Sequence, residues 1–413
     1  MTAKPKLLYI ANIRMPTEKA HGLQIAQNCE AFADAGADVE LWVARRVNTP
    51  ELGAMTDIWA HYGVKRNFTL RRIPCIDLLP LVPNRNDLLA RLIFYFQQGT
   101  FVLMALLRAL FTGADIFYSR DAINILALSF IKPGHKLAYE AHRRTSGRGG
   151  RWLQSQVIRR AGTVIAVTAR LKEDLEKLSP PPSPLPASQR GGEEKFMVAH
   201  DGIRAERFAN LPSQAEARAV VGWPQDAFIV GYVGRLQTMA MDKGVGALVE
   251  ALRDVKGATL ALVGGPEDSA EEFHQYWLKL GMEEVHFLNA GQVSPERVPI
   301  YLSALDVCAM PFPWTEHFAY YASPMKLFEY MASRRVIVAT DLPSTAEVVH
   351  DGESALLVPP SDAAAFGAAI VRLRDDPALR ERLAERAYVE VLGHYTWASR
   401  AAAILKKVMR DEG

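Results

Sequence analysis

The stretch I-V-G-Y-V-G-R (229–235) lies near the middle of the chain and places a glycine and a cation directly behind a short apolar run. Such a run is typical of a buried strand, and the glycine lets another backbone or a ligand approach its end. Similar runs follow it, and amphipathic stretches of about ten residues or more separate most of them. The stretch therefore predicts the first strand of a parallel sheet covered by helices on both faces.

Working outward, the sequence shows two such series. Before the stretch, a helix with Ile25, Cys29 and Phe32 on one face, closed by Gly36, lies between the first two runs. Polar sequence near 200–225 separates the series, so we predict two doubly wound α/β domains, 1–205 and 206–395. The expected strands are 7–10, 39–43, 115–118, 136–140 and 163–167, with F-M-V-A (196–199), and then 229–233, 259–263, 285–288, 306–310, 336–339 and 355–358.

Length and composition agree with two globular domains. The chain has 413 residues, of which 49% are hydrophobic and 23% charged, so disordered, collagen-like and coiled-coil proteins are excluded. Three cysteines are too few for a disulfide framework or a four-ligand zinc site, and they indicate a reducing compartment. The opening M-T-A-K-P-K-L-L-Y-I reads as a buried strand rather than a signal peptide, and we expect a cytoplasmic protein.

The net charge of +2 hides an asymmetry between the two halves. Residues 1–200 carry 27 Lys and Arg against 17 Asp and Glu (+10), and residues 201–413 carry 21 against 29 (−8). A basic first half favours an anionic partner, and the alternative is an arginine-rich solvated surface. We expect no nucleic-acid partner, because the arginines lack the interleaved aromatic residues of known reader motifs.

Two further segments have a distinctive composition. The stretch S-P-P-P-S-P-L-P-A-S-Q-R-G-G (179–192) can form neither a helix nor a central strand, so we expect an exposed loop. The tail from Pro377 is expected to be helical to its end, and Tyr395-Thr396-Trp397 opens its last segment.

Polar residues that follow the expected strands are candidates for function, because doubly wound sheets bind ligands at the carboxyl ends of their strands. In the first half, Gly22 stands at a helix start, where a glycine lets an anion approach unpaired N–H groups. His142 follows strand 136–140 just past its end. A histidine there favours a functional role over a purely structural one.

The second half places two cations around a helix start. Arg235 follows strand 229–233, and Asp242-Lys243-Gly244 opens the next helix, an arrangement that suits a diphosphate. The sequence G-Y-V-G-R lacks the third glycine of a dinucleotide fingerprint, so NAD binding is disfavoured. Gly264-Gly265-Pro266 forms a turn that allows close approach of a backbone.

The segment P-W-T-E-H-F-A-Y-Y-A-S-P-M-K-L-F-E-Y-M-A (313–332) carries the most polar and aromatic side chains. Ser323 is expected to cap a helix whose first turn contains Pro324. Lys326 then lies against the positive end of the helix dipole, which indicates a bound phosphate. Glu329 lies on the same face, and the alternative is a surface Lys–Glu pair.

Together these motifs resemble the retaining glycosyltransferases of family 4, which have the GT-B fold. The resemblance is specific in G-R-L…D-K-G (234–244), L-V-G-G-P (262–266), A-G-Q-V (290–293), S-P-M-K-L-F-E-Y-M-A (323–332) and L-V-P-P-S-D (357–362). It is looser in H-G-L-Q (21–24), the strand ending at His142, A-V-T-A-R-L (166–171) and H-D-G-I (200–203). It implies two Rossmann-like domains facing a cleft, with the last helix, 396–413, crossing back to the first domain.

The resemblance also implies roles for single residues. Arg235 and Lys243 would hold the diphosphate of a nucleotide-sugar donor and act in catalysis, and His142 would face the transferred sugar. The other implied donor contacts are Gly22, Gly265, Val293 through its backbone, the helix start Ser323, Pro324, Met325, Lys326 and Leu327, and Glu329 on the ribose hydroxyls. The family commonly has a second carboxylate eight positions before Glu329, where this chain has Tyr321, with Glu316 the nearest acidic residue.

The implied reaction is glycosyl transfer with retention of anomeric configuration, to a glycan or lipid-linked acceptor. Fixed cations and helix-terminal N–H groups can stabilise the leaving diphosphate, so we expect neither a cofactor nor a required metal. Two alternatives stay open: a nucleotide-sugar epimerase on the same fold, and a weakly active subunit of a glycan-assembly complex. No paired carboxylates of glycosidase type are evident.

Residues 88–111 are unusually apolar. The run between Arg91 and Arg108 has 16 residues and contains Gln97-Gln98-Gly99, which is short of the ~20 needed to span a bilayer. One interpretation is a buried helix or helical hairpin. The other is an exposed surface that docks on an anionic membrane, flanked by Arg66, Arg71, Arg72, Arg85 and Arg91 and by six arginines in 143–160. Docking would make the protein peripheral on the inner face of the cell membrane.

Overall fold

A computed structural model describes residues 4–17, 19–82, 88–179, 195–238 and 241–410. It divides into two compact units, Met1–His200 with Trp397–Gly413, and Asp201–Thr396. The boundaries expected from sequence, after residues 205 and 395, lie close to these. Most of the proline-rich segment 179–192 lies outside the described residues, as does Arg85.

The first unit is built on a seven-stranded parallel sheet in the order β3-β2-β1-β4-β5-β6-β7. This is a doubly wound order, in which the chain reverses direction between β1 and β4. The strands are β1 (Lys6–Ala11), β2 (Asp38–Ala44), β3 (Thr69–Ile73), β4 (Ile116–Ser119), β5 (Leu137–Ala141), β6 (Thr163–Ala166) and β7 (Phe196–Val198).

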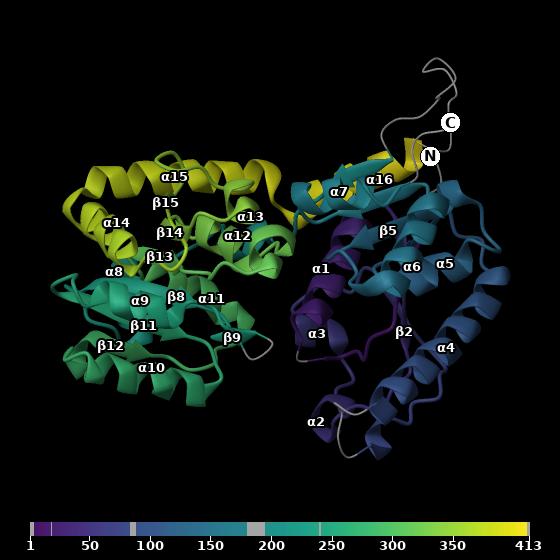
Figure 1. Ribbon diagram of the computed structural model, residues 1–413, viewed down its shortest axis with the longest axis horizontal. Coiled ribbons are helices and arrows are strands. Elements are labelled where there is room, and N and C mark those ends of the chain that lie inside the picture. The colour runs from purple at the N-terminus through teal and green to yellow at the C-terminus, as the bar shows by residue number, and fades with distance from the viewer. Residues whose placement is uncertain (1–3, 18, 83–87, 180–194, 239–240, 411–413) are drawn as a thin grey trace. The chain divides into compact units, whose positions relative to one another are not determined.

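Helices cover both faces of this sheet (Figure 1). On one side α4, α5 and α6 pack in a row, and α1 packs against the last helix, α16. Thus the C-terminal helix belongs to the first unit. The helices are α1 (Ala20–Asp34), α2 (Pro50–Gly53), α3 (Ile58–Tyr62), α4 (Leu88–Leu110), α5 (Ala122–Leu128), α6 (Gly147–Arg160), α7 (Ala169–Glu176) and α16 (Trp397–Arg410).

The second unit repeats the architecture with a six-stranded parallel sheet in the order β12-β11-β8-β13-β14-β15, reversing between β8 and β13. The strands are β8 (Phe228–Val233), β11 (Ala258–Val263), β12 (Phe287–Asn289), β13 (Val307–Met310), β14 (Val336–Thr340) and β15 (Leu356–Val358), and a two-stranded ribbon joins β9 (Gln237–Thr238) to β10 (Met241–Asp242). The helices are α8 (Gln214–Val221), α9 (Val245–Leu252), α10 (Glu267–Lys279), α11 (Val298–Ser303), α12 (Met325–Ala332), α13 (Pro343–Ala346), α14 (Ala363–Asp375) and α15 (Pro377–His394).

The doubly wound fold class is confirmed, and a strand is found at each expected place, although the expected strand 285–288 begins only at Phe287 because a 3-10 turn, Glu284–His286, precedes it. One strand of the large sheets escaped prediction. The sequence of β3, T-L-R-R-I, lies at the edge of its sheet, and only Ile73 is buried there. An edge strand exposed on both faces carries no apolar run that a periodicity argument could detect.

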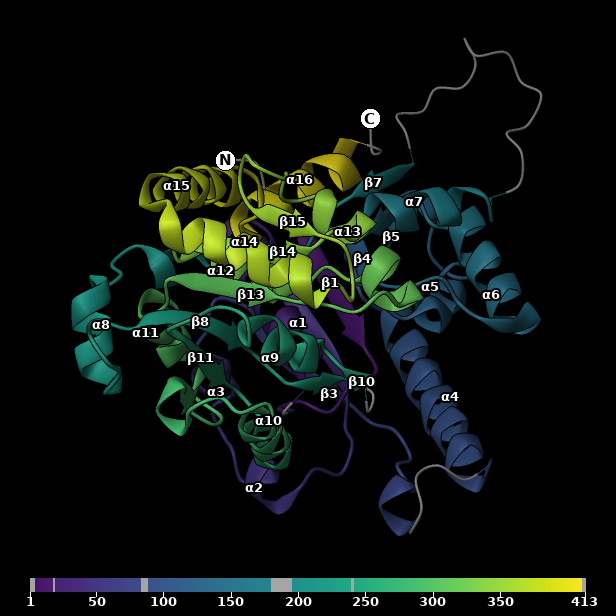
Figure 2. The same ribbon diagram turned by 60° about the vertical axis from the view of Figure 1, so that its left-hand side comes forward.

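Residues 88–110 form a single helix rather than a hairpin, and most of the helix is not buried. Figure 2 shows α4 along the side of the first unit, with no described element of that unit on its outer side. The interpretation of this segment as a buried helix or hairpin is therefore wrong.

Candidate functional site

Three cations lie close together at the carboxyl end of β8, where the second sheet reverses direction. The ammonium group of Lys326 donates a hydrogen bond to the Tyr232 hydroxyl and lies 3.6 Å from the centre of the Tyr232 ring. Burial and then the neighbouring Arg235 lower the pKa of Lys243 to about 8. Burial and then Lys243 lower the pKa of Lys326 well below its ordinary value.

Within the described part of the chain, no carboxylate forms an ion pair with Arg235, Lys243 or Lys326. The charge of Glu329 acts on Lys326 but forms no ion pair with it, so three cations that repel one another form a site prepared for a multiply charged anion such as a diphosphate. Lys326 donates to Tyr232 and forms no ion pair with Glu329, and neither side chain is exposed, so the alternative of a surface Lys–Glu pair is wrong.

The backbone around these cations is closely packed. Gly264 has φ +142°, and a Cβ there would lie 2.1 Å from the carbonyl oxygen of Gly234. Only glycine fits this crossing of two loops. Gly265 accepts a hydrogen bond from the Leu236 N–H at 2.9 Å, which ties the two loops together. The Asp242 carboxylate accepts from the Val245 N–H at 3.0 Å and so holds the start of α9 beside Lys243.

Ser323 does not cap α12, contrary to the expectation from sequence. The cap position is Pro324, which offers no side-chain acceptor, and the Ser323 hydroxyl accepts instead from the Asp201 N–H at 2.9 Å. The Leu327 N–H donates to the Pro324 carbonyl oxygen at 2.9 Å. The backbone N–H groups that the helix start leaves for an anion are therefore those of Met325 and Lys326.

The expected contacts to the nucleoside flank this group. Burial raises the pKa of Glu329, while the nearby charges of Arg207 and Lys326 act to lower it. Val293 is half-buried in the loop after β12 and packs against the core of the unit. A carboxylate and a backbone at these places can accept hydroxyl and base donors, and their roles stay predictions.

Tyr321 occupies the position where the resembled family commonly has a carboxylate. It lies in the π-helical turn His317–Tyr321, and its hydroxyl donates to the Glu316 carboxylate at 3.3 Å. Glu316 lies five positions before Tyr321 and so does not take the place of the family's carboxylate in sequence. The fold nevertheless brings the Glu316 carboxylate into contact with the Tyr321 hydroxyl.

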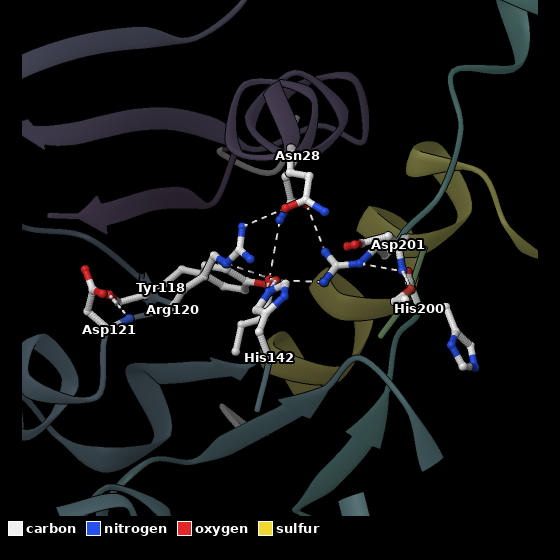
Figure 3. A network of polar contacts seen from close by, with 12 residues as sticks. Asn28, Tyr118, Arg120, Asp121, His142, His200 and Asp201 are labelled. Atoms are coloured by element: carbon white, nitrogen blue, oxygen red, sulfur yellow. Dashed lines mark hydrogen bonds and ion pairs between the residues drawn. The ribbon is translucent and has the colours of Figure 1, made fainter. Parts of the chain in front are cut away.

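In the first unit, His142 follows β5 and its Nε2 contacts the buried carboxylate of Glu140. Figure 3 shows His142, Tyr118, Arg120 and Asn28 around this carboxylate. The Tyr118 hydroxyl donates to it, and Arg400 from α16 forms an ion pair with it at 3.1 Å. Burial alone would raise the pKa of Glu140, but Arg400 and His142 hold it at about 2, so this carboxylate stays charged.

A cavity of about 530 Å³ opens beside this network. It lies where the first sheet reverses direction, since residues that follow β1, β4 and β5 line it. His142 and Arg143 come from the end of β5, Arg120 and Asp121 from the end of β4, and His21 from the start of α1. Histidine and arginine side chains at such an opening can hydrogen-bond the hydroxyl groups of a sugar.

Gly22 lies in the first turn of α1. A Cβ at this position would lie 2.4 Å from the Thr17 methyl group and 2.6 Å from the Tyr62 hydroxyl. Its N–H donates to the Lys19 carbonyl oxygen at 3.0 Å and is not unpaired. Packing within the first unit therefore already requires a glycine, and a contact with the donor stays a prediction.

Sequence reasoning missed Glu140 and Arg400 in the first unit and Tyr232 and Arg207 in the second. Glu140 could have been found, because residues two apart in a strand share a face, which puts it beside His142. Arg400 lies far away in sequence, and no local pattern connects it to β5. Among the described residues no cluster of three or more His, Cys, Asp or Glu could hold a metal ion.

Solved structures with the same fold are sugar-transferring enzymes of the GT-B type. Sucrose-phosphate synthase from Thermosynechococcus elongatus matches with a TM-score of 0.74 and 18% identity, covering 98% of this chain and 99% of that one. The HepE protein of Anabaena in complex with UDP matches with a TM-score of 0.70 and 17% identity, covering 98% and 100%. The chain has the GT-B fold.

Residues 227–376 match the profile of the family described as glycosyl transferases group 1. This part of the chain is similar to that family, as the motifs of the second half indicated. A curated relative, the D-inositol 3-phosphate glycosyltransferase of Streptomyces scabiei, is 26% identical over 269 residues, which are 62% of this chain and 56% of the relative. The chain thus spans about half the length of the first curated relatives it matches.

Proposed function

We propose that the protein is a retaining glycosyltransferase that moves a sugar from a nucleoside-diphosphate sugar to a glycan or lipid-linked acceptor. Its place would be the synthesis of cell-surface glycans or glycolipids. The unneutralised group of Arg235, Lys243 and Lys326 carries this proposal, because it provides the charge that a diphosphate leaving group requires. The Anabaena protein of the same fold that binds UDP supports a nucleotide-bound donor.

In this proposal the second unit holds the leaving group. Arg235 and Lys243 bind the diphosphate and stabilise the negative charge that develops as the bond to the sugar breaks. The N–H groups of Met325 and Lys326 add neutral donors at the start of α12. Glu329 accepts from the ribose hydroxyls and Val293 contacts the base through its backbone. These cations and N–H groups stabilise the leaving diphosphate without a metal.

His142 of the first unit positions the transferred sugar. Its contact with Glu140 fixes the ring, because a carboxylate of low pKa holds one ring N–H in place. The ring is thereby held at the edge of the cavity, where we expect it to contact a hydroxyl group of the sugar. Glu140 acts through His142 and is a positioning residue.

Donor binding is tested first, by a thermal-shift screen of the full chain with UDP, GDP, ADP and their sugars. A ligand at 100 times its Kd stabilises the protein by ~2.7 kcal/mol, which is a readable shift. The double variant R235A/K243A should lose the shift, while Lys279→Ala, an exposed cation at the end of α10, should keep it. Equal shifts in the double variant and the wild type would contradict the site.

Turnover then separates the proposal from its two alternatives. A transferase consumes the donor faster when an acceptor is present. An epimerase would change the configuration of the donor sugar without any acceptor. A weakly active subunit of an assembly complex would bind the nucleotide and consume no donor.

A further inference from the structure

Helix α4 buries mainly small residues and exposes most of its large apolar residues. The buried positions are Ala90, Gln97, Phe101, Ala105 and Ala109. At 100° per residue they fall within one face, and the opposite face carries exposed large side chains. These are Leu88, Leu92, Phe96, Leu103, Leu107 and Leu110, and Leu92 and Leu103 are 58% and 55% exposed.

This pattern is the reverse of an ordinary amphipathic helix, in which the large apolar residues face the core and polar residues face water. Contiguous exposed apolar surface of this kind marks an interaction site. The 23 residues of α4 include only two charged side chains, Arg91 and Arg108, and no acidic one. The outer face of the helix is therefore suited to contact an apolar surface, and the described residues of the first unit offer none on that side.

The buried face ties α4 into the first unit. The side chains of Gln97 and Asn12 exchange two hydrogen bonds, at 3.0 and 3.3 Å, and the Ile76 N–H donates to Thr100. Phe101 is fully buried. A helix that crossed the bilayer would have to leave these contacts and uncover the β-sheet, so α4, although long enough to span, is an element of the domain.

The apolar surface continues past the end of the helix. Phe111 is 91% exposed and Phe130 is 71% exposed. The Lys132 ammonium group donates to the Thr112 carbonyl oxygen at 3.1 Å, which holds the Phe130 loop beside the end of α4. The guanidinium group of Arg160 lies 5.7 Å from the Phe130 ring, so cations border the surface at this end.

Cations border it at the other end too. A groove of about 330 Å³ runs beside the first turns of α4, and its described lining residues include Arg14, Lys19, Arg46, Arg91 and a single carboxylate, that of Asp77. Arg46 pairs with Asp77 at 3.4 Å, and among the described lining residues the cations outnumber the carboxylates. Phe94 and Tyr95 form its apolar wall, so the groove combines cations with apolar surface.

We propose that the outer face of α4, with Phe111 and Phe130, docks flat on a lipid bilayer that carries anionic headgroups. The apolar side chains enter the boundary between headgroups and acyl chains, while the groove and Arg160 contact the acidic headgroups. A long apolar surface with cations at both ends suits a bilayer surface better than a protein partner, because a bilayer offers acyl chains and acidic headgroups over that whole length. This surface lies in the first unit and does not depend on the proposed donor site.

The first experiment is co-sedimentation of the full chain with vesicles of phosphatidylcholine alone and of phosphatidylcholine with 30% phosphatidylglycerol. We expect at least tenfold tighter binding to the anionic vesicles at low salt, and a marked loss at high salt. L103E/L107E should abolish binding, and Arg91→Glu should weaken it several-fold. The matched control V220E/V285E changes exposed apolar residues of the second unit and should bind as the wild type does.

The second experiment measures depth. Cysteine variants at Leu92, Leu103 and Leu107 carry an environment-sensitive dye, and quenchers placed at known depths in the acyl chains report how far each position enters. Flat docking predicts the same shallow depth at all three positions. A helix that spans the bilayer would place position 103, which is nearest to the helix centre, clearly deeper than positions 92 and 107, and this result would overturn the proposal.

The remaining outcomes are equally decisive. Equal binding of wild type and L103E/L107E would remove α4 from the membrane contact. No binding to anionic vesicles, together with a dimer that L103E/L107E dissociates, would assign the surface to a second copy of the chain instead.

Discussion

At the scale of single residues, Lys243 and Lys326 show how a site can be prepared before its ligand arrives. Burial and like charges lower both pKa values, so each lysine binds its proton less firmly in the free protein. An anion bound between the two lysines would raise both pKa values again. The mutual repulsion of the cations destabilises the free protein, and a bound diphosphate offsets this repulsion by attracting all of them.

The first prediction concerns these cations. Arg235→Ala and Lys243→Ala should each weaken the binding of the cognate nucleoside diphosphate by about 1.5–3 kcal/mol, because each removes a charge-assisted hydrogen bond. Isothermal titration calorimetry measures it. Unchanged affinity in both variants would remove these residues from the site.

The second prediction is that binding takes up protons. With the Lys243 pKa at about 8, part of this lysine is neutral near pH 8, and a bound diphosphate raises its pKa again. Affinity should therefore fall as the pH rises through 8. The heat of binding at pH 8 should also differ between two buffers of different ionisation enthalpy, and identical heats in both would contradict the prediction.

The third prediction concerns His142. His142→Ala should lower the transfer rate by ~10²-fold or more, with nucleoside-diphosphate affinity unchanged, because this side chain lies in the first unit and is assigned to the sugar. Initial rates at saturating donor measure it. His135→Ala, an exposed histidine before β5, is the control and should keep full activity. A loss of nucleotide affinity in His142→Ala would place the residue elsewhere.

At the scale of elements, the sequence predicted the strands and helices that leave a periodic pattern of apolar residues. Strands such as β8 and β11 are continuous apolar runs because helices cover both faces of their sheets. The edge strand β3, the ion pair of Arg400 and the hydrogen bond between Ser323 and Asp201 depend on contacts between distant segments, and no local pattern reports them. For the candidate site, the cations that follow β8 were found by position, while their aromatic partner Tyr232 was hidden inside the apolar run of its strand.

The fourth prediction concerns helix α16. Arg400 joins this helix to the rest of its unit through Glu140, Asn28 and the His200 carbonyl oxygen. Arg400→Ala leaves the buried Glu140 charge without its partner, which costs about 3–5 kcal/mol. Hydrogen exchange should then speed up in α1, β5 and α16 and stay unchanged in the second unit. Lys406→Ala, an exposed cation of the same helix, should leave all rates unchanged.

At the scale of the whole molecule, the two units should respond differently to acid. The pKa of Glu140 is lowered to about 2 and that of His200, chiefly by burial, to about 4. Both groups bind protons more weakly in the folded state than in the unfolded one, so both stabilise the first unit less as the pH falls. The stability that neutral His200 contributes is lost as the pH falls from about 6.5 to 4, and the stability that charged Glu140 contributes is lost from about 4.5 to 2.

We therefore expect the first unit to lose stability before the second as the pH falls from 7 to 4. Hydrogen exchange followed by unit measures this loss. His200→Gln should reduce the pH dependence between 6.5 and 4 and leave the lower range unchanged. A second unit that opens first under acid would contradict the assignment.

The central claim is retaining transfer of a sugar from a nucleoside-diphosphate donor, and one measurement tests it most directly. Proton NMR follows the full chain with the donor selected by the thermal-shift screen and a lipid-linked or glycan acceptor. Coupling constants at the anomeric proton report the configuration of donor and product in the same sample. The account predicts a product with the configuration of the donor, formed by the wild type and lost in R235A/K243A. A product of inverted configuration, or equal turnover in the double variant, would contradict it.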